Sequence, residues 1–206
     1  MAAGYKDFTA GSALAAADLE DYCELQSAMR FASVAARDAA LASVKTAGML
    51  AINTDLNQLA IYDGTGWVIL AEPAQTWTPT ITGITTTSGT WVADYHRRDG
   101  WCDYVAELTF GASSAITGET VLTLPVAAAG TTVGLHEGSF YDSSAGSTFQ
   151  LSSAYTGVNT TMRFRAINTA GTYATGVATS ATIPVAFGTG DKLTMRGSYR
   201  MTTRYS

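Results

Sequence analysis

The chain has 206 residues, of which 47% are hydrophobic and only 14% are charged, and its formal net charge is −5 at pH 7. Enough apolar residues are present for a buried core, and the charged fraction is well below the roughly 25% of an average soluble protein. An acidic balance disfavours nucleic acid as a partner, because phosphate-binding surfaces are rich in Lys and Arg. Without a long apolar run or a signal-peptide pattern, we expect neither membrane insertion nor secretion.

Residues 14–30 have the periodicity of an amphipathic helix. Leu19, Tyr22 and Met29 fall on one side at 100° per residue, and Gln26 lies within the same stripe. A polar residue in an apolar seam is typical of identical helices packed about a symmetry axis. An amphipathic helix that lies on its own domain fits the pattern equally well.

A second, shorter helix is predicted over residues 34–41, with Ser33 as its N-cap. Three short strands separated by Asn, Asp and Gly turns follow at residues 49–52, 59–62 and 67–70. Strands this short are marginal by themselves. We therefore expect Trp67 to lie in a contact between chains or between domains.

The best candidate linker is residues 71–75, where Pro73 interrupts both helix and strand patterns. Beyond it the hydrophobic period changes to two. Strands are predicted at residues 78–84, 91–97, 102–110, 120–124, 134–141, 148–152, 162–166, 181–185 and 193–201. This pattern predicts a mainly β protein in which residues 1–75 form a helical and hairpin module and residues 76–206 form an antiparallel, jelly-roll-like β-sandwich.

The sequence offers little for catalysis. Its two histidines, His96 and His136, are each expected to be solvated residues of a strand or turn rather than general bases, and no metal-ligand spacing is present. Residues 141–147 could offer oxygens to an ion, but a plain hairpin loop is the favoured interpretation. The cysteines, Cys23 and Cys102, are expected to be unpaired. We predict no enzymatic activity, no cofactor and no metal.

Aromatic residues cluster around a predicted turn at Asp99-Gly100. Three of them, Trp91, Tyr95 and Tyr104, share strand faces with apolar residues and are expected in the core. Trp101 is the one expected outside. If the chain binds a surface, the candidate contact loop consists of His96, Arg97, Arg98 and Trp101.

Four arginines alternate along two predicted strands, on what should be outer faces: Arg163, Arg165, Arg196 and Arg200. Such a row is usually solvated surface. It could also pair with the N-terminal module of a neighbouring copy, because residues 1–75 contain nine acidic and four basic residues. Salt-sensitive association would follow from that pairing.

Several segments of the first third occur in a characteristic order: DFTAGSALAAADL at 7–19, MRFA at 29–32, AARDAAL at 35–41, and Gly48-Met49 followed by YDGTGWV at 62–68. In this order and spacing they resemble the N-terminal module of minor tail and fibre proteins of tailed bacteriophages, especially those that infect actinobacteria. Ala15 departs from the Thr or Ser common there, so Ser12 is the alternative N-cap. The remainder is similar only in style to fibre-tip and decoration domains.

The resemblance implies a virion structural protein, a homotrimer that docks on the particle through its N-terminal module and projects a β-sandwich toward a host-surface glycan or another virion part. The oligomer or virion contact would then involve Leu19, Tyr22, Met29 and Trp67. Two alternatives stay open. One is a capsid decoration or head-fibre protein without a receptor role, and the other is a virion-associated hydrolase of cell-wall glycans.

Overall fold

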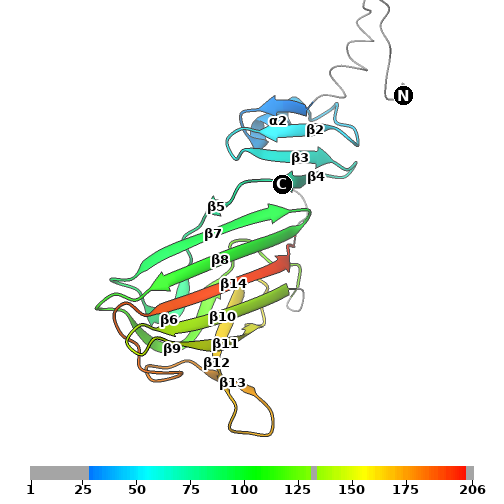
Figure 1. Cartoon of the computed structure of the whole chain (residues 1–206). Coiled ribbons are helices and arrows are strands. Elements are labelled where there is room, and N and C mark those ends of the chain that lie inside the picture. Colours follow the sequence, from blue (N-terminus) through cyan, green and yellow to red (C-terminus); the bar gives the residue numbers. More distant parts are fainter. Residues whose placement is uncertain (1–27, 131–133, 203–206) are drawn as a thin grey trace, which may run out of the picture. The chain divides into compact units, whose positions relative to one another are not determined.

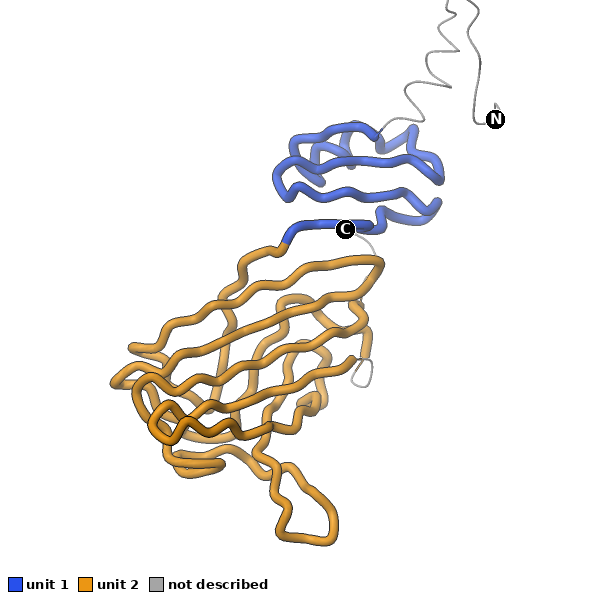
Figure 2. The backbone as a smooth tube through the Cα atoms, viewed as in Figure 1, with its two compact units in different colours: residues 1–73, 204–206 blue, residues 74–203 orange. Residues whose placement is uncertain are grey.

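The computed structural model describes residues 28–130 and 134–202. The described chain divides into two compact units, one that ends at Pro73 and one that begins at Ala74 (Figure 2). The division falls within the predicted linker, two residues before the boundary expected at residue 75. Here the two are called the first unit and the second unit.

The first unit is a small four-stranded sheet with one short helix (Figure 1). Its elements are β1 (Ala28–Phe31), α2 (Val34–Ala40), β2 (Leu50–Asn53), β3 (Gln58–Tyr62) and β4 (Trp67–Ala71). The strands lie in the order β1-β2-β3-β4. The two hairpins are antiparallel, whereas β1 pairs with β2 in parallel.

The short helix and the three strands that follow it are confirmed. The N-cap is also confirmed, because the backbone N–H of Ala36 donates to Ser33 Oγ at 3.1 Å. The helical prediction is wrong for residues 28–30, which form β1 because the edge of β2 offers them a ladder of backbone hydrogen bonds. The rest of that predicted helix, with Leu19 and Tyr22, lies outside the described residues.

Trp67 lies in the core of the first unit. Its side chain is 3% exposed, its ring centroid is 5.5 Å from that of Tyr62, and the fully buried Arg37 guanidinium stands 4.6 Å above it. A bond of 2.9 Å to Asp38 holds that guanidinium in place. This placement corrects the expected contact between chains or domains, since residues of its own unit already cover the ring. Met29 packs at the margin of the same core.

The opposite face of this sheet is also apolar, but it is less well covered. Because side chains alternate along a strand, this face carries the residues between the core positions. Leu50, Ile52, Leu59 and Ile61 are half-buried there, whereas Val68, the cross-strand partner of Ile61, is 2% exposed. The first unit therefore keeps a patch of aliphatic side chains, here called the aliphatic face, in contact with solvent.

The second unit is entirely β, and its strands form one curled antiparallel sheet (Figure 1). The strands are β5 (Gln75–Thr76), β6 (Ile81–Thr85), β7 (Thr90–Arg98), β8 (Trp101–Thr109), β9 (Ala115–Thr123), β10 (Gly134–Asp142), β11 (Ser147–Tyr155), β12 (Thr161–Asn168), β13 (Thr175–Ala178) and β14 (Lys192–Arg200). Their order is β5-β7-β8-β14-β10-β11-β12-β9-β6, with β13 added to β12. The last of the described strands, β14, thus lies in the middle of the sheet.

A single stretch of chain, residues 75–85, joins the two ends of this sheet. Its first part pairs with β7, where Trp77 N–H donates to Ala93 O at 3.1 Å. Its second part pairs with β9, where Thr123 N–H donates to Thr80 O at 2.9 Å. The long strands next to the two ends of the sheet, β7 and β9, therefore each have a hydrogen-bonded neighbour on their outer side. The hydrogen bonds define one sheet, whereas a jelly roll has two.

The core of the second unit follows the predicted alternation. Leu108, Phe164 and Met195 are buried on the faces expected for them. Tyr104 is buried and Trp91 and Tyr95 pack at the core margin, as expected, whereas Trp101 is 45% exposed. The thiol of Cys102 belongs to this core; Cys23 lies outside the described residues.

Three elements of the second unit differ from the sequence prediction, and one of them is the short strand β5 at the end of the predicted linker. Residues 181–185 form an irregular stretch with one isolated bridge between Ser180 and Ile183, so the predicted strand there is wrong. Pro184 has no N–H to donate to a ladder. The short strand β13 was not predicted, because its sequence, TGVA, has little alternation and gains its strand character from pairing with β12.

Candidate functional site

The β7–β8 hairpin has the turn predicted from the sequence. Asp99 and Gly100 both have positive φ, 47° and 81°, which is the conformation that a two-residue hairpin turn requires. Arg98 and Trp101 are consequently direct cross-strand partners. The turn thus places an arginine beside the exposed tryptophan.

The four residues of the predicted contact loop do not all lie on one face. His96, Arg98 and Trp101 share the outer face of the sheet, and His96 Nε2 lies 3.1 Å from Asp103 Oδ2. Arg97 pairs in register with the buried Cys102, so it belongs to the opposite face. The structure brings together three of the four predicted residues and separates Arg97 from them.

Strand pairing adds residues to this site that the sequence prediction did not include. On β14, Arg200 is the cross-strand partner of Trp101, and Ser198 is that of Asp103. On β10, Leu135 pairs with Ser198 and is 83% exposed. No local signal in the sequence indicates that these three strands are neighbours, because β8, β14 and β10 are far apart along the chain.

A groove of about 430 Å³ runs over this end of the sheet. It is lined by Trp101, Gly134, Leu135, Ser198 and Arg200. We call it the outer groove. Its size lies in the range of small-ligand sites, roughly 300–1,000 Å³.

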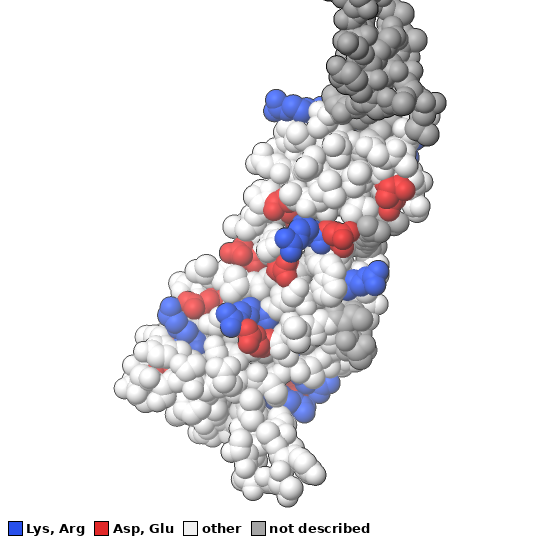
Figure 3. All heavy atoms as spheres, turned by 45° about the vertical axis from the view of Figure 1, so that its right-hand side comes forward, with Lys and Arg blue, Asp and Glu red and all other residues white. Residues whose placement is uncertain are grey.

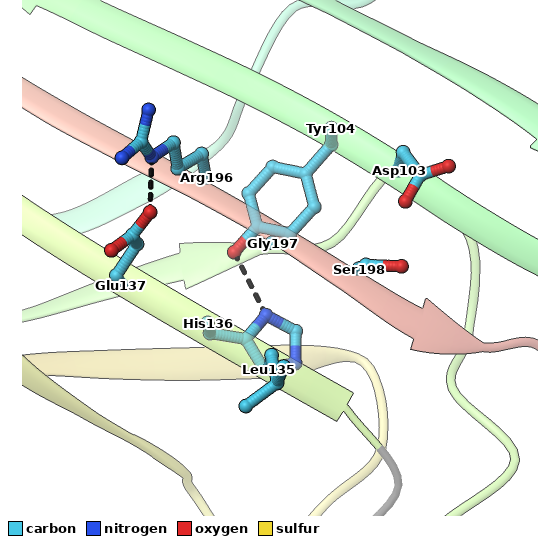
Figure 4. A pocket seen from close by; sticks show the side chains of 8 residues that line it. All are labelled: Asp103, Tyr104, Leu135, His136, Glu137, Arg196, Gly197 and Ser198. Carbon is cyan, nitrogen blue, oxygen red and sulfur yellow. Dashed lines mark hydrogen bonds and ion pairs between the residues drawn. The ribbon is translucent and has the colours of Figure 1, made fainter.

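A second hollow of about 470 Å³ continues from the outer groove and shares Leu135 and Ser198 with it (Figure 4). Its other lining residues are Asp103, Tyr104, His136, Glu137, Arg196 and Gly197. Figure 4 shows the Arg196 guanidinium bonded to the Glu137 carboxylate at one side of the hollow. The two hollows share a wall and together provide one lined surface for a ligand.

His136 lies among tyrosines rather than in solvent, which corrects the sequence expectation. Its Nδ1 is 3.1 Å from the hydroxyl oxygen of Tyr104, and its Nε2 is 3.1 Å from that of Tyr155. Its ring stacks on Tyr199, with centroids 5.5 Å apart. Burial lowers the pKa of His136 from 6.5 to about 4, so the imidazole is neutral at pH 7.

The tyrosines of this cluster are also uncharged at neutral pH. Burial is the largest cause that raises the pKa of Tyr104 and of Tyr199 above its ordinary value of 10. Burial likewise raises the pKa of Tyr155. A neutral imidazole with one N–H and one acceptor nitrogen can bond both flanking hydroxyls at once. The cluster is therefore suited to fixing the geometry beneath the hollow.

Most of the predicted arginine row forms ion pairs within the chain. Arg163 and Arg165 both approach Glu119, and Arg196 pairs with Glu137. Figure 3 shows the result on one face of the molecule, where acidic and basic side chains lie interspersed on a largely uncharged surface. Three of the four arginines thus have a glutamate partner within the chain. Arg200 is the exception.

The candidate ion loop, residues 141–147, uses its one carboxylate for hydrogen bonds within the loop. Asp142 Oδ1 accepts bonds from Ser144 N–H at 2.9 Å, Ser144 Oγ–H at 2.7 Å and Ala145 N–H at 3.0 Å. The Ser144 hydroxyl is the main cause that lowers the pKa of Asp142. In the part of the chain that the structure describes, no group of three or more His, Cys, Asp or Glu side chains has a metal-binding arrangement.

No family model, curated protein or solved structure matches this chain. Within residues 28–130 and 134–202, no helix has the length and apolar character needed to cross a membrane.

Proposed function

We propose that this chain is a structural protein of a tailed-bacteriophage virion, a minor tail, fibre or spike subunit that holds the particle through its first unit and binds a surface through its second unit. The observation that carries the proposal is the outer groove. An exposed indole and an exposed aliphatic side chain flank it, on a sheet whose other face is a well-packed core. Exposed apolar patches of this kind are typical of binding sites.

The proposal includes self-association into a homotrimer through the first unit. Its support is the aliphatic face, where Leu50, Ile52, Leu59 and Ile61 remain half-buried. A four-stranded sheet with apolar side chains on both sides needs a cover for each side. Copies of the same chain around an axis would supply it.

The experiment that tests the proposal is localisation on virions. An antibody raised against the second unit should label one defined place on purified particles in electron micrographs, and the chain should remain with particles through a density gradient. Label at the tail or fibre tip supports the proposal. Label spread over the capsid favours a decoration protein, and absence of the chain from particles refutes both.

The competing enzyme function has its own test. Purified chain is incubated with cell-wall polysaccharide of the host, and reducing ends are measured over time. Release of reducing ends above a heat-inactivated sample would replace the binding proposal with a hydrolase. We expect none.

A further inference from the structure

The outer groove begins at an aromatic ring between two cations. Trp101 is the cross-strand partner of Arg98 on β7 and of Arg200 on β14, so the three side chains form a row on one face. Adjacent strands are spaced by about 4.8 Å, and the row therefore spans about 10 Å. All three side chains are exposed.

The two arginines of this row differ from the other cations of the second unit. Arg163, Arg165, Arg196 and Lys192 each lie within 4 Å of a glutamate oxygen. Among the described residues, the guanidiniums of Arg98 and Arg200 have no carboxylate partner. Two arginines therefore flank the ring, and unlike those four cations they lie beside no glutamate oxygen.

We propose that the row of Arg98, Trp101 and Arg200 binds an acidic saccharide, one that carries carboxylate or phosphate groups. This rests on the proposed function and specifies its ligand. The indole face would stack on the C–H face of a sugar ring, and the guanidiniums would bind the anionic groups in a bidentate manner. Next along the sheet, the Ser198 hydroxyl would donate or accept hydrogen bonds with sugar hydroxyls, and the Asp103 carboxylate would accept them.

A saccharide fits these features better than a nucleic acid does. Affinity for a polynucleotide comes from many phosphate contacts along a basic surface. Residues 76–206 contain eight basic and eight acidic residues, and Glu137 and Asp103 border the hollow that adjoins the outer groove. The groove of about 430 Å³ suits a short ligand rather than a long strand.

The test is isothermal titration of the full-length chain with four defined probes: trigalacturonate, its uncharged methyl ester, a short glycerol phosphate oligomer and an oligothymidylate. At least one acidic probe, carboxylate or phosphate, should bind at least tenfold more tightly than the methyl ester. The difference between the carboxylate and phosphate probes then identifies the anionic group.

Three variants locate the site. Trp101→Ala should weaken the binding of the acidic probe at least tenfold. The double variant Arg98→Ala/Arg200→Ala should reduce the affinity for the acidic probe to that for the methyl ester. Arg30→Ala removes an exposed positive charge from the first unit and should leave binding unchanged. Circular dichroism should be unchanged in all three, because each altered side chain is exposed.

Three results would overturn the inference: no binding of either acidic probe, equal binding of the methyl ester, or equally tight oligothymidylate binding that depends on the same residues. If any of them occurs while the chain is found on virions, the proposed function survives and only its ligand is wrong. Conversely, binding of the acidic probe by a chain absent from virions would refute the virion role and leave the saccharide site intact.

Discussion

At the scale of single residues, Gly197 makes the tyrosine–histidine cluster possible. It lies on β14 between Tyr104 of β8 and His136 of β10, on the same face of the sheet. A Cβ atom at this position would stand 2.4 Å from His136 Nδ1 and 2.9 Å from Tyr104 Cε1. Because glycine has no side chain, the two rings can approach each other across this position.

We expect Gly197→Ala to destabilise the protein by about 1–3 kcal/mol, the usual effect of forcing an extra methyl group into a packed site. Urea denaturation followed by circular dichroism measures the change. Gly118→Ala is the matched control, because a Cβ there would meet nothing nearer than 4.0 Å. Equal stability of the two variants would contradict the packing explanation.

The lowered pKa of His136 predicts a pH dependence of stability. In the unfolded chain the imidazole takes up a proton below its ordinary pKa of 6.5, whereas in the folded chain it does so only near 4. Between these values the unfolded state binds more protons, so stability falls as the pH falls from 6.5 to 4. Melting temperatures measured across this range should show the loss.

The variant His136→Gln isolates this contribution, because glutamine retains hydrogen-bonding groups but does not titrate. Its melting temperature should fall less between pH 6.5 and pH 4 than that of the native chain. If the melting temperature of His136→Gln fell as much between pH 6.5 and pH 4 as that of the native chain, other groups would be the cause of the acid sensitivity.

At the scale of elements, a buried carboxylate ties the β10–β11 hairpin to the segment before β14. Asp191 Oδ1 accepts bonds from both Ser143 N–H and Ser143 Oγ–H at 2.9 Å, and Oδ2 accepts one from Gly188 N–H at 2.7 Å. Asp191 is 2% exposed. The carboxylate thus joins two loops that are distant in the sequence.

Asp191→Ala should cost about 2–3 kcal/mol of stability, because bonds to a charged acceptor are lost and buried donors remain. Ser143→Ala removes only the hydroxyl and should cost about 1 kcal/mol. Chemical denaturation of both variants checks the order. If Asp191→Ala lowered the free energy of unfolding no more than Ser143→Ala does, the role of the carboxylate would be contradicted.

The sequence pattern predicted the elements whose hydrophobic alternation is local. It did not predict the elements that are strands only because they pair with a neighbouring strand. The alternation in β8, β12 and β14 was sufficient to assign their buried faces. By contrast, β1 and β13 are strands because of their neighbours. The candidate site divides in the same way. Trp101 and Arg98 could be identified from a hairpin pattern, but Arg200 and Leu135 join them only through the position of β14.

At the scale of the whole molecule, the aliphatic face predicts self-association. Light scattering coupled to size exclusion should give three times the 21.5 kDa mass of one chain. Ile61→Lys places a charge on the half-buried aliphatic face and should shift the mass toward that of a monomer. Thr65→Lys, in the exposed β3–β4 turn, is the matched control and should leave the mass unchanged. A native chain with the mass of a monomer would refute the trimer.

The central position of β14 also affects how the second unit is made. Until the ribosome has released residues 192–200, β8 and β10 have no partner on the sides that β14 later occupies. A nascent or truncated chain therefore exposes two adhesive strand edges at once. Premature termination shortly before Lys192 should yield aggregates rather than a smaller soluble domain.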